Sequence, residues 1–325
     1  MTKALEARKG RDHAGLLRYE TVLAIITIIA LAVLANITNK FFTVDNLLNQ
    51  GRLMAEVGLV ALGMTFVIVT GGIDLSVGSI LGLTAILLGV FWHNVGMPLP
   101  LAIVAAMVCG TAAGALNGYV ITRFRVPPLI TTLATLALYR GLAEGISQAR
   151  SVRGYPEWFF FFGQGEVLGV PVQLWTLVIL IAVAAIVLGR TKFGYATYAI
   201  GANETAARFS GIRVDRVKLA IYAGTGFLAS LAAVIFVSRV TTTRSDMGTG
   251  IELDVITAVV LGGTSIFGGK GTIAGTVLGL VLIQALKNGL SLSGVKGDGT
   301  IVVIGVVLIA AILAGALIDR NRGGN

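Results

Sequence analysis

The sequence predicts an all-α polytopic membrane protein with about ten transmembrane helices, some of them short or broken. Hydrophobic residues make up 55% of the 325 residues, a further 43 residues are glycine, and only 13% are charged. A soluble domain carries about 25% charged residues, and its interior is too small to bury this much apolar surface. The apolar residues gather in long runs, which we expect to cross the lipid as helices.

Each run is close to the length that a bilayer requires. A hydrocarbon core of about 30 Å needs about 20 mostly apolar residues in helical form. Such runs lie at residues 21–38, 54–71, 75–92, 99–121, 127–147, 172–188, 219–238, 254–267, 272–287 and 300–318. The chain therefore divides into a charged leader at 1–20, a membrane domain at 21–318 and a tail at 319–325.

The distribution of basic residues predicts which side of the membrane holds the termini. Ten spans place both ends of the chain on the same side. The segments expected on that side, among them 1–20 and 189–218, hold twice as many Lys and Arg residues as the segments on the other side. Because basic loops stay cytoplasmic, both termini are predicted to be cytoplasmic. The run at 21–38 is interpreted as a retained anchor rather than a cleaved signal peptide.

Charge and reactive residues exclude several other classes of protein. The formal charge of +9 comes from short basic clusters between the apolar runs, so we expect contact with membrane lipid and not with nucleic acid. Cys109 is the single cysteine, and His13 and His93 are far apart in the sequence, so no metal site is expected. The runs also lack the cluster of carboxylates typical of a proton or sodium relay, which argues against an ion-coupled carrier.

Glycine-rich breaks interrupt two pairs of runs in the same way. The first break contains Gly71 and Gly72, and a G-[ST]-[IV]-L-G-L block begins at Gly78. The second break contains Gly268 and Gly269, and the same block begins at Gly275, each position 197 residues later. Two interpretations fit: an internal repeat with broken helices beside a translocation pathway, or the chance recurrence of glycine-rich turns.

The fifth run carries two charged residues, Arg140 and Glu144. A charge at the centre of a membrane helix costs about 2.5–3.5 kcal/mol. The i,i+4 spacing places both side chains on one face, where they are expected to neutralise each other, and Thr132 and Thr135 lie one to two turns earlier. This face either lines a path for a hydrophilic substrate or is a self-paired structural brace.

Other polar residues near the breaks have the same two interpretations. Asp74 is expected to cap the third run by accepting a hydrogen bond from the amide of Ser76 or Val77. Asn117 and Gln284 can serve a pathway or simply bond between helices. The candidate pathway residues are therefore Asp74, Ser76, Asn117, Thr132, Thr135, Arg140, Glu144 and Thr264.

A short helix is predicted within the connection at 189–218. Asn203 is a good N-cap, Glu204 suits the positive helix N-terminus, and Gly211 suits the C-terminal stop. A helix of about two turns is marginal by itself. It must therefore pack against something, either a partner protein or the membrane surface.

This connection resembles the coupling segment of ribose-type sugar permeases of bacterial ABC importers. The residues that carry the resemblance are Gly201-x-Asn203-Glu204-x-Ala206-Ala207-x-x-Ser210-Gly211-Ile212. Two further blocks match the same family, at 71–78 and at 250–271. The resemblance covers roughly residues 45–318, and the three ordered blocks are specific to it.

The resemblance implies a permease subunit for a monosaccharide or related polyhydroxylated solute in the bacterial inner membrane. The expected partners are two ATP-binding subunits, an extracytoplasmic sugar-binding protein and a second permease copy, identical or paralogous. Contact with the ATP-binding subunits is expected at Gly201, Asn203, Glu204, Ala206, Ala207 and Gly211.

The chain is not expected to be an enzyme or to hold a cofactor. It lacks the G-x-x-x-x-G-K-[ST] motif that cradles phosphates, so ATP and Mg²⁺ are expected in the partner subunits. The alternative is an ion-coupled or facilitative secondary sugar carrier. A membrane enzyme is disfavoured because no nucleophile–base pair stands out.

Overall fold

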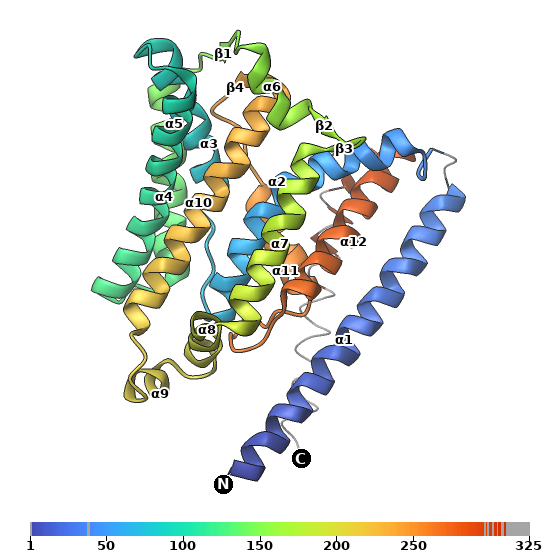
Figure 1. Ribbon diagram of the computed structural model, residues 1–325, viewed down its shortest axis with the longest axis vertical. Helices are drawn as coiled ribbons and strands as arrows, with labels where there is room; N and C mark the ends of the chain where they lie inside the picture. The colour runs from blue at the N-terminus through green and yellow to red at the C-terminus, as the bar shows by residue number, and fades with distance from the viewer. Residues whose placement is uncertain are drawn as a thin grey trace.

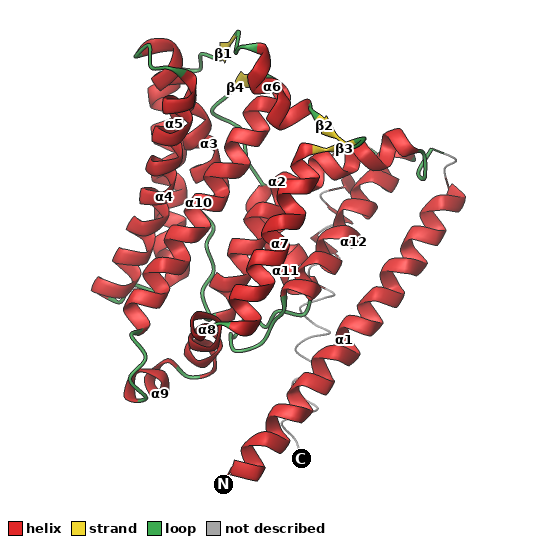
Figure 2. Cartoon of the chain, in the orientation of Figure 1, coloured by secondary structure: helices red, strands yellow, loops and turns green. Residues whose placement is uncertain are grey.

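The computed structural model describes residues 2–37 and 40–295, together with 297, 299–300, 302–303, 305–306 and 309. These residues form a bundle of helices with two very short strand pairs at one end (Figures 1 and 2). The tail expected at 319–325 and most of the run expected at 300–318 lie outside the described residues.

The helices follow one another with short connections. Their bounds are α1 Thr2–Ile37, α2 Val44–Val69, α3 Val77–Gly89, the π-helix η1 Val90–Asn94, α4 Leu99–Phe124, α5 Pro128–Ser147, α6 Glu157–Gln164, α7 Val172–Arg190, α8 Lys192–Ala202, α9 Glu204–Phe209, α10 Val214–Val240, α11 Ile251–Leu261 and α12 Ile273–Leu292. The strands are β1 Val152–Arg153, β2 Glu166–Val167, β3 Val170–Pro171 and β4 Thr242–Thr243, with β1 antiparallel to β4 and β2 antiparallel to β3.

Prolines mark where helices begin. All six lie at the first positions of α4, α5, α6 and α7 or just before them: Pro98, Pro100, Pro127, Pro128, Pro156 and Pro171. Proline suits these positions because the first amides of a helix have no intrahelical acceptor and the fixed φ of the ring is already helical. The local sequence thus sets the start of four helices.

The prediction of an all-α membrane protein is confirmed, but the number of about ten spans is not. Within the described residues, seven helices are long and apolar enough to cross a bilayer: α1, α2, α3 with η1, α4, α7, α10 and α12. Helix α11 has 11 residues, a rise of about 16 Å at 1.5 Å per residue, and cannot cross by itself. Helix α5 is not among the seven, and polar side chains such as Thr131, Thr132 and Arg140 interrupt its sequence.

Glycines allow α10 to lie very close to α4 in the middle of the bundle. A Cβ added to Gly114 of α4 would lie 2.9 Å from the Cα of Gly226 in α10, and one added to Gly118 would lie 2.9 Å from the Cα of Leu219. Backbones that approach this closely gain dispersion contacts that lipid does not supply. This packing makes α10 a fixed support for the elements at both of its ends.

The two ends of the bundle carry different elements (Figure 1). Helices α8 and α9 and the breaks after α2 and α11 lie at one end, called here the α9 end. Helix α6 and the β1–β4 pair lie at the opposite end, the α6 end. Helix α1 runs along one side against α12, and Tyr19 donates a hydrogen bond to the carbonyl of Leu261 at 2.8 Å. From Thr2 onward, the expected leader at 1–20 is continuous with this helix.

Candidate coupling and translocation sites

The predicted short helix in the connection at 189–218 is α9, and its predicted caps are confirmed. Asn203 Oδ1 accepts a hydrogen bond from the amide of Ala206 at 2.9 Å. Gly211 ends the turn after the helix with φ of +83°, a conformation that residues with a Cβ rarely adopt. The connection also contains a second helix, α8, whose cap Thr191 accepts from the amide of Gly194.

Ion pairs hold α9 against the start of α10. Glu204 pairs with Arg208 at 2.9 Å and with Lys218 at 2.5 Å, and Arg208 also pairs with Asp215 at 2.5 Å. Beneath this network, Ala207 is buried against Ile200 and Val214. The six residues of α9 are too few for a stable isolated helix, so these contacts determine its position.

The charges of this network shift the pKa of Glu204. Burial by itself would raise the pKa of Glu204, but hydrogen bonds and charge from Lys218 and Arg208 lower it below its ordinary value. The network therefore stays ionised at neutral pH.

Phe209 ends α9 and is a surface residue that the sequence analysis did not single out. Its side chain is 89% exposed and lies next to the ionic network of Glu204 and Arg208. The sequence motif gave no signal for this residue, since Phe209 occupies an unspecified position inside the matching block. Only the structure shows that it points away from the bundle core.

The three sequence blocks meet where α8 ends. A Cβ at Gly201 would overlap the carbonyl oxygen of Val69, the last residue of α2, and the amide of Gly269 in the second break. The Gly269 amide itself donates to Val69 O at 2.9 Å. A Cβ at Gly268 would lie 2.9 Å from both Gly71 N and Gly201 O. We call these contacts among Gly201, Val69, Gly71, Gly268 and Gly269 the glycine junction.

Four of the candidate pathway residues form one buried polar cluster between α3, α4 and α5. Asp74 Oδ1 accepts from the Ser76 amide at 2.9 Å, as the sequence predicts, and from the Ser76 hydroxyl at 2.6 Å. Asn117 Nδ2 donates to Ser76 Oγ at 2.8 Å. Thr132 donates to the carbonyl of Ile73 at 3.1 Å. Asp74, Ser76, Asn117 and Thr132 are buried, so the cluster holds the first break to the neighbouring helices.

The other four pathway candidates lie apart from this cluster. Thr135 is buried on α5 and bonds to its own helix, at the carbonyls of Thr131 and Thr132. Thr264 is buried in the second break, where its side chain limits the space beside Gly271. Glu144 is exposed near the end of α5.

The expected pairing of Arg140 with Glu144 is wrong. Arg140 Nη1 donates to the carbonyls of Ser245 and Met247 at 2.5 and 3.0 Å, and Nη2 donates to Gly78 O at 3.3 Å. Backbone carbonyls satisfy the planar guanidinium donors at several points, which a single carboxylate one turn away does not. Arg140 therefore fastens the segment between α10 and α11 to α3 and α5.

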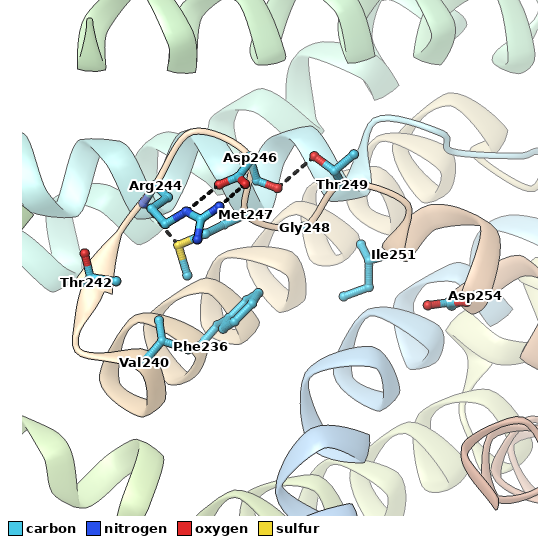
Figure 3. Close-up of a pocket in the computed structure, with 10 residues that line it drawn as sticks. All are labelled: Phe236, Val240, Thr242, Arg244, Asp246, Met247, Gly248, Thr249, Ile251 and Asp254. Carbon is cyan, nitrogen blue, oxygen red and sulfur yellow. Dashed lines mark hydrogen bonds and ion pairs between the residues drawn. The ribbon is translucent and has the colours of Figure 1, made fainter. Parts of the chain in front are cut away.

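That segment borders a pocket that the sequence analysis did not predict. A cavity of about 430 Å³ lies at the α6 end between the end of α10, residues 242–249 and the start of α11 (Figure 3). Its polar lining includes Arg244, Asp246 and Asp254. The signal in the sequence was a set of charges from 239 to 254 between two apolar runs. Within the described part of the chain, no group of three His, Cys, Asp or Glu side chains is placed to hold a metal ion.

A comparison with known protein families decides the class of protein. Residues 44–312 match the family described as branched-chain amino acid transport system / permease component. The chain belongs to this permease family. The match covers all three sequence blocks, the glycine junction and the pocket, and it confirms the resemblance drawn from those blocks.

Several characterised permeases are similar to this permease over most of their length. The ribose import permease protein RbsC of Escherichia coli K12 is 39% identical over 89% of this chain and 90% of its own. RbsC of Bacillus subtilis is 43% identical over 80% and 81%. The autoinducer 2 import system permease protein LsrD of Escherichia coli O9:H4 is 38% identical over 83% and 84%. No solved structure is significantly similar to this permease.

Proposed function

We propose that this permease is the membrane subunit of an ATP-driven importer for a monosaccharide or a related polyhydroxylated solute. The observation that carries the proposal is the coupling segment: α9 is braced by ion pairs, exposes Phe209, and is joined through α8 to both breaks. Two of the relatives are named as import permeases for ribose and for autoinducer 2, and these names support the class of solute.

The proposed arrangement puts the α9 end in the cytoplasm and the α6 end outside. Separate ATP-binding subunits dock on α9, an extracytoplasmic sugar-binding protein docks on the α6 end, and a second copy or paralogue completes the permease pair. The number of membrane-embedded segments is about ten when three are added to the seven long apolar helices: α5, α11 and the run expected at 300–318. Both termini are then cytoplasmic. The permease itself catalyses no reaction, and ATP with Mg²⁺ binds in the partner subunits.

The proposed mechanism is alternating access. Closure of the ATP-binding subunits moves α9, and α8 transmits the movement to the glycine junction at the ends of α2 and α11. The buried cluster around Asp74 follows the first break, so the bundle opens toward one end and then the other. A neutral solute suits this bundle because Glu56 pairs with Arg239, Asp254 pairs with Lys287, and Arg140 is bonded to backbone carbonyls.

Uptake into lipid vesicles tests this function. The permease is reconstituted with its ATP-binding subunits and sugar-binding protein, and uptake of radiolabelled pentoses and hexoses is measured with and without enclosed ATP. We expect uptake only with ATP and the binding protein. Equal uptake without ATP would establish a secondary carrier and refute the proposal.

A helix-breaking substitution tests the role of α9 in the same vesicles. Ala207→Pro removes a backbone donor within the helix, because the Ala207 amide bonds to the Asn203 carbonyl at 3.0 Å. We expect it to abolish uptake and transport-coupled ATP hydrolysis while leaving folded permease in the membrane. Wild-type coupling in this variant would contradict the assignment of α9.

A further inference from the structure

The pocket at the α6 end combines apolar and polar walls. Phe236 and Ile251 face the space from α10 and α11, and Arg244, Asp246, Thr249 and Asp254 supply polar groups (Figure 3). Its volume of about 430 Å³ lies within the range of roughly 300–1,000 Å³ that small-molecule pockets occupy. The pocket is therefore large enough for a small organic solute.

The charges in this pocket are already balanced. Arg244 Nε donates to Asp246 Oδ1 at 2.9 Å, and its Nη2 bonds to the other carboxylate oxygen. Asp254 pairs with Lys287 at 2.5 Å. Because each carboxylate has a basic partner, an ionic ligand would have to separate a pair, whereas a neutral ligand would not.

The same groups retain capacity for hydroxyl groups. A guanidinium has five N–H donors and a carboxylate has about four acceptor sites, more than one ion pair uses. The Thr249 hydroxyl bonds to Asp246 O at 2.7 Å and can also accept. Phe236 offers an apolar ring edge or face on the opposite wall (Figure 3). Hydroxyl-binding groups opposite an aromatic side chain fit a neutral polyhydroxylated ring.

The base of the pocket is fixed to the membrane helices. Arg140 holds the carbonyls of Ser245 and Met247 and also Gly78 O. A Cβ at Gly78 would overlap both Gly248 O and the Glu252 carboxylate, so α3 and the 245–252 segment touch directly. A site for a solute needs groups held in place by such a second layer.

One short segment connects the pocket to the coupling end. At Gly71 it contacts the glycine junction beside Gly201, and at Gly78 it contacts the pocket segment at Gly248. Between these points, Asp74 and Ser76 tie it into the buried polar cluster. Movement of α8 and a change in pocket shape therefore act on the same eight residues.

We propose that this pocket is the site where the permease binds its neutral polyhydroxylated solute, with Asp246, Arg244 and Thr249 bonding the hydroxyl groups and Phe236 packing against the ring. This inference rests on the proposed function and names the solute site within it. The solute contacts are then assigned to the pocket and not to the buried cluster around Asp74. That cluster instead links the pocket to the glycine junction.

Transport kinetics of the full complex test the site. The monosaccharide that the wild type imports is chosen from the pentose and hexose panel, and its apparent KM is measured in vesicles for Asp246→Asn and Thr249→Val. We expect KM to rise roughly tenfold and fivefold, the scale of a charged and a neutral hydrogen bond. The control is Asp45→Asn, an exposed carboxylate in the first turn of α2 that does not line the pocket, and its KM should stay within about twofold.

Chemical protection provides a measurement that does not depend on transport. In a Cys109→Ser background, Thr249→Cys places the sole thiol at the pocket, and the same monosaccharide should slow its reaction with a maleimide. Leu168→Cys, exposed at the same end outside the pocket, should react at an unchanged rate.

The outcomes separate this inference from the proposed function. Wild-type uptake that is equal with and without ATP refutes the proposed function. Import with unchanged KM in both variants and no protection at position 249 overturns the pocket alone. The pocket variants could instead leave the KM for the sugar unchanged and raise only the concentration of sugar-binding protein needed for half-maximal uptake. That result would identify the pocket as a protein-docking surface and would also overturn the inference.

Discussion

Substitution of Gly201 by alanine tests whether the glycine junction transmits movement from the coupling segment. A Cβ there has no room, because it would overlap Val69 O and the Gly269 amide. Both neighbours are backbone atoms at helix ends, so neither can rotate away as a flexible side chain can. The Gly269–Val69 hydrogen bond of 2.9 Å must lengthen or α8 must shift.

The magnitude follows from these contacts. Overpacking by one carbon in a tight interior typically costs about 1–3 kcal/mol, and loss of the hydrogen bond adds about 1 kcal/mol. A shift of about 2 kcal/mol in the balance between the two states of the transporter changes their ratio about 30-fold. We therefore expect coupled uptake to fall at least tenfold.

The assay is ATP-dependent uptake together with ATP hydrolysis stimulated by the loaded sugar-binding protein. Gly189→Ala is the matched control, because Gly189 lies at the end of α7 next to the same connection and a Cβ there meets nothing within 4 Å. Co-purification of the ATP-binding subunits with both variants shows that assembly survives. Equal coupled uptake in the Gly201 and Gly189 variants would refute the role of the junction.

Three further predictions concern the ion pairs and the exposed end of α9. Phe209→Ala should weaken binding of the ATP-binding subunits by about 10–100-fold, since burying a Phe contributes about 1.5–3 kcal/mol; equal loss in Leu168→Ala, which is 89% exposed at the opposite end, would contradict this. Because Lys218 and Arg208 lower the folded-state pKa of Glu204, the stability from these pairs is present at neutral pH and is lost as pH falls through that lowered value. Limited proteolysis at 203–213 should therefore accelerate only below the ordinary carboxylate range, and acceleration near pH 6 would be inconsistent with the network. Glu56→Gln removes one partner of a buried pair with Arg239 at 2.7 Å and should lower stability by about 3–5 kcal/mol; thermal unfolding in detergent measures this, with the more exposed Glu166→Gln as a control that should change little.

Local chemistry was sufficient to predict several parts of the coupling segment. The Asn203 cap and the Gly211 stop both depend on residues within one turn of each other, so nearest-neighbour hydrogen bonding and the φ preference of glycine decide them. The Asp74–Ser76 contact was predictable for the same reason. The internal repeat stays a prediction, although Gly78 and Gly275 both lie in the first turn of their helices.

Contacts between distant segments were not predictable in this way. The i,i+4 rule paired Arg140 with Glu144, but three carbonyls from α3 and the 245–247 segment take its donors instead. The rule describes an isolated helix, and burial against a neighbouring backbone offers more acceptors than one exposed carboxylate. The span at 254–267 was too long because Gly262 and Gly263 turn the chain after Leu261.

The amino-acid sequence alone determined that this protein is a helical membrane permease, because apolar run length, glycine breaks and basic loops act through the bilayer and through the nearest residues along the chain. Tertiary structure decided where these parts act. It brought Gly201, Gly71 and Gly268 into one junction and formed the open pocket beside Asp246. Close approach of backbones and the shape of a pocket depend on how helices far apart in the sequence pack, and no local pattern specifies that packing.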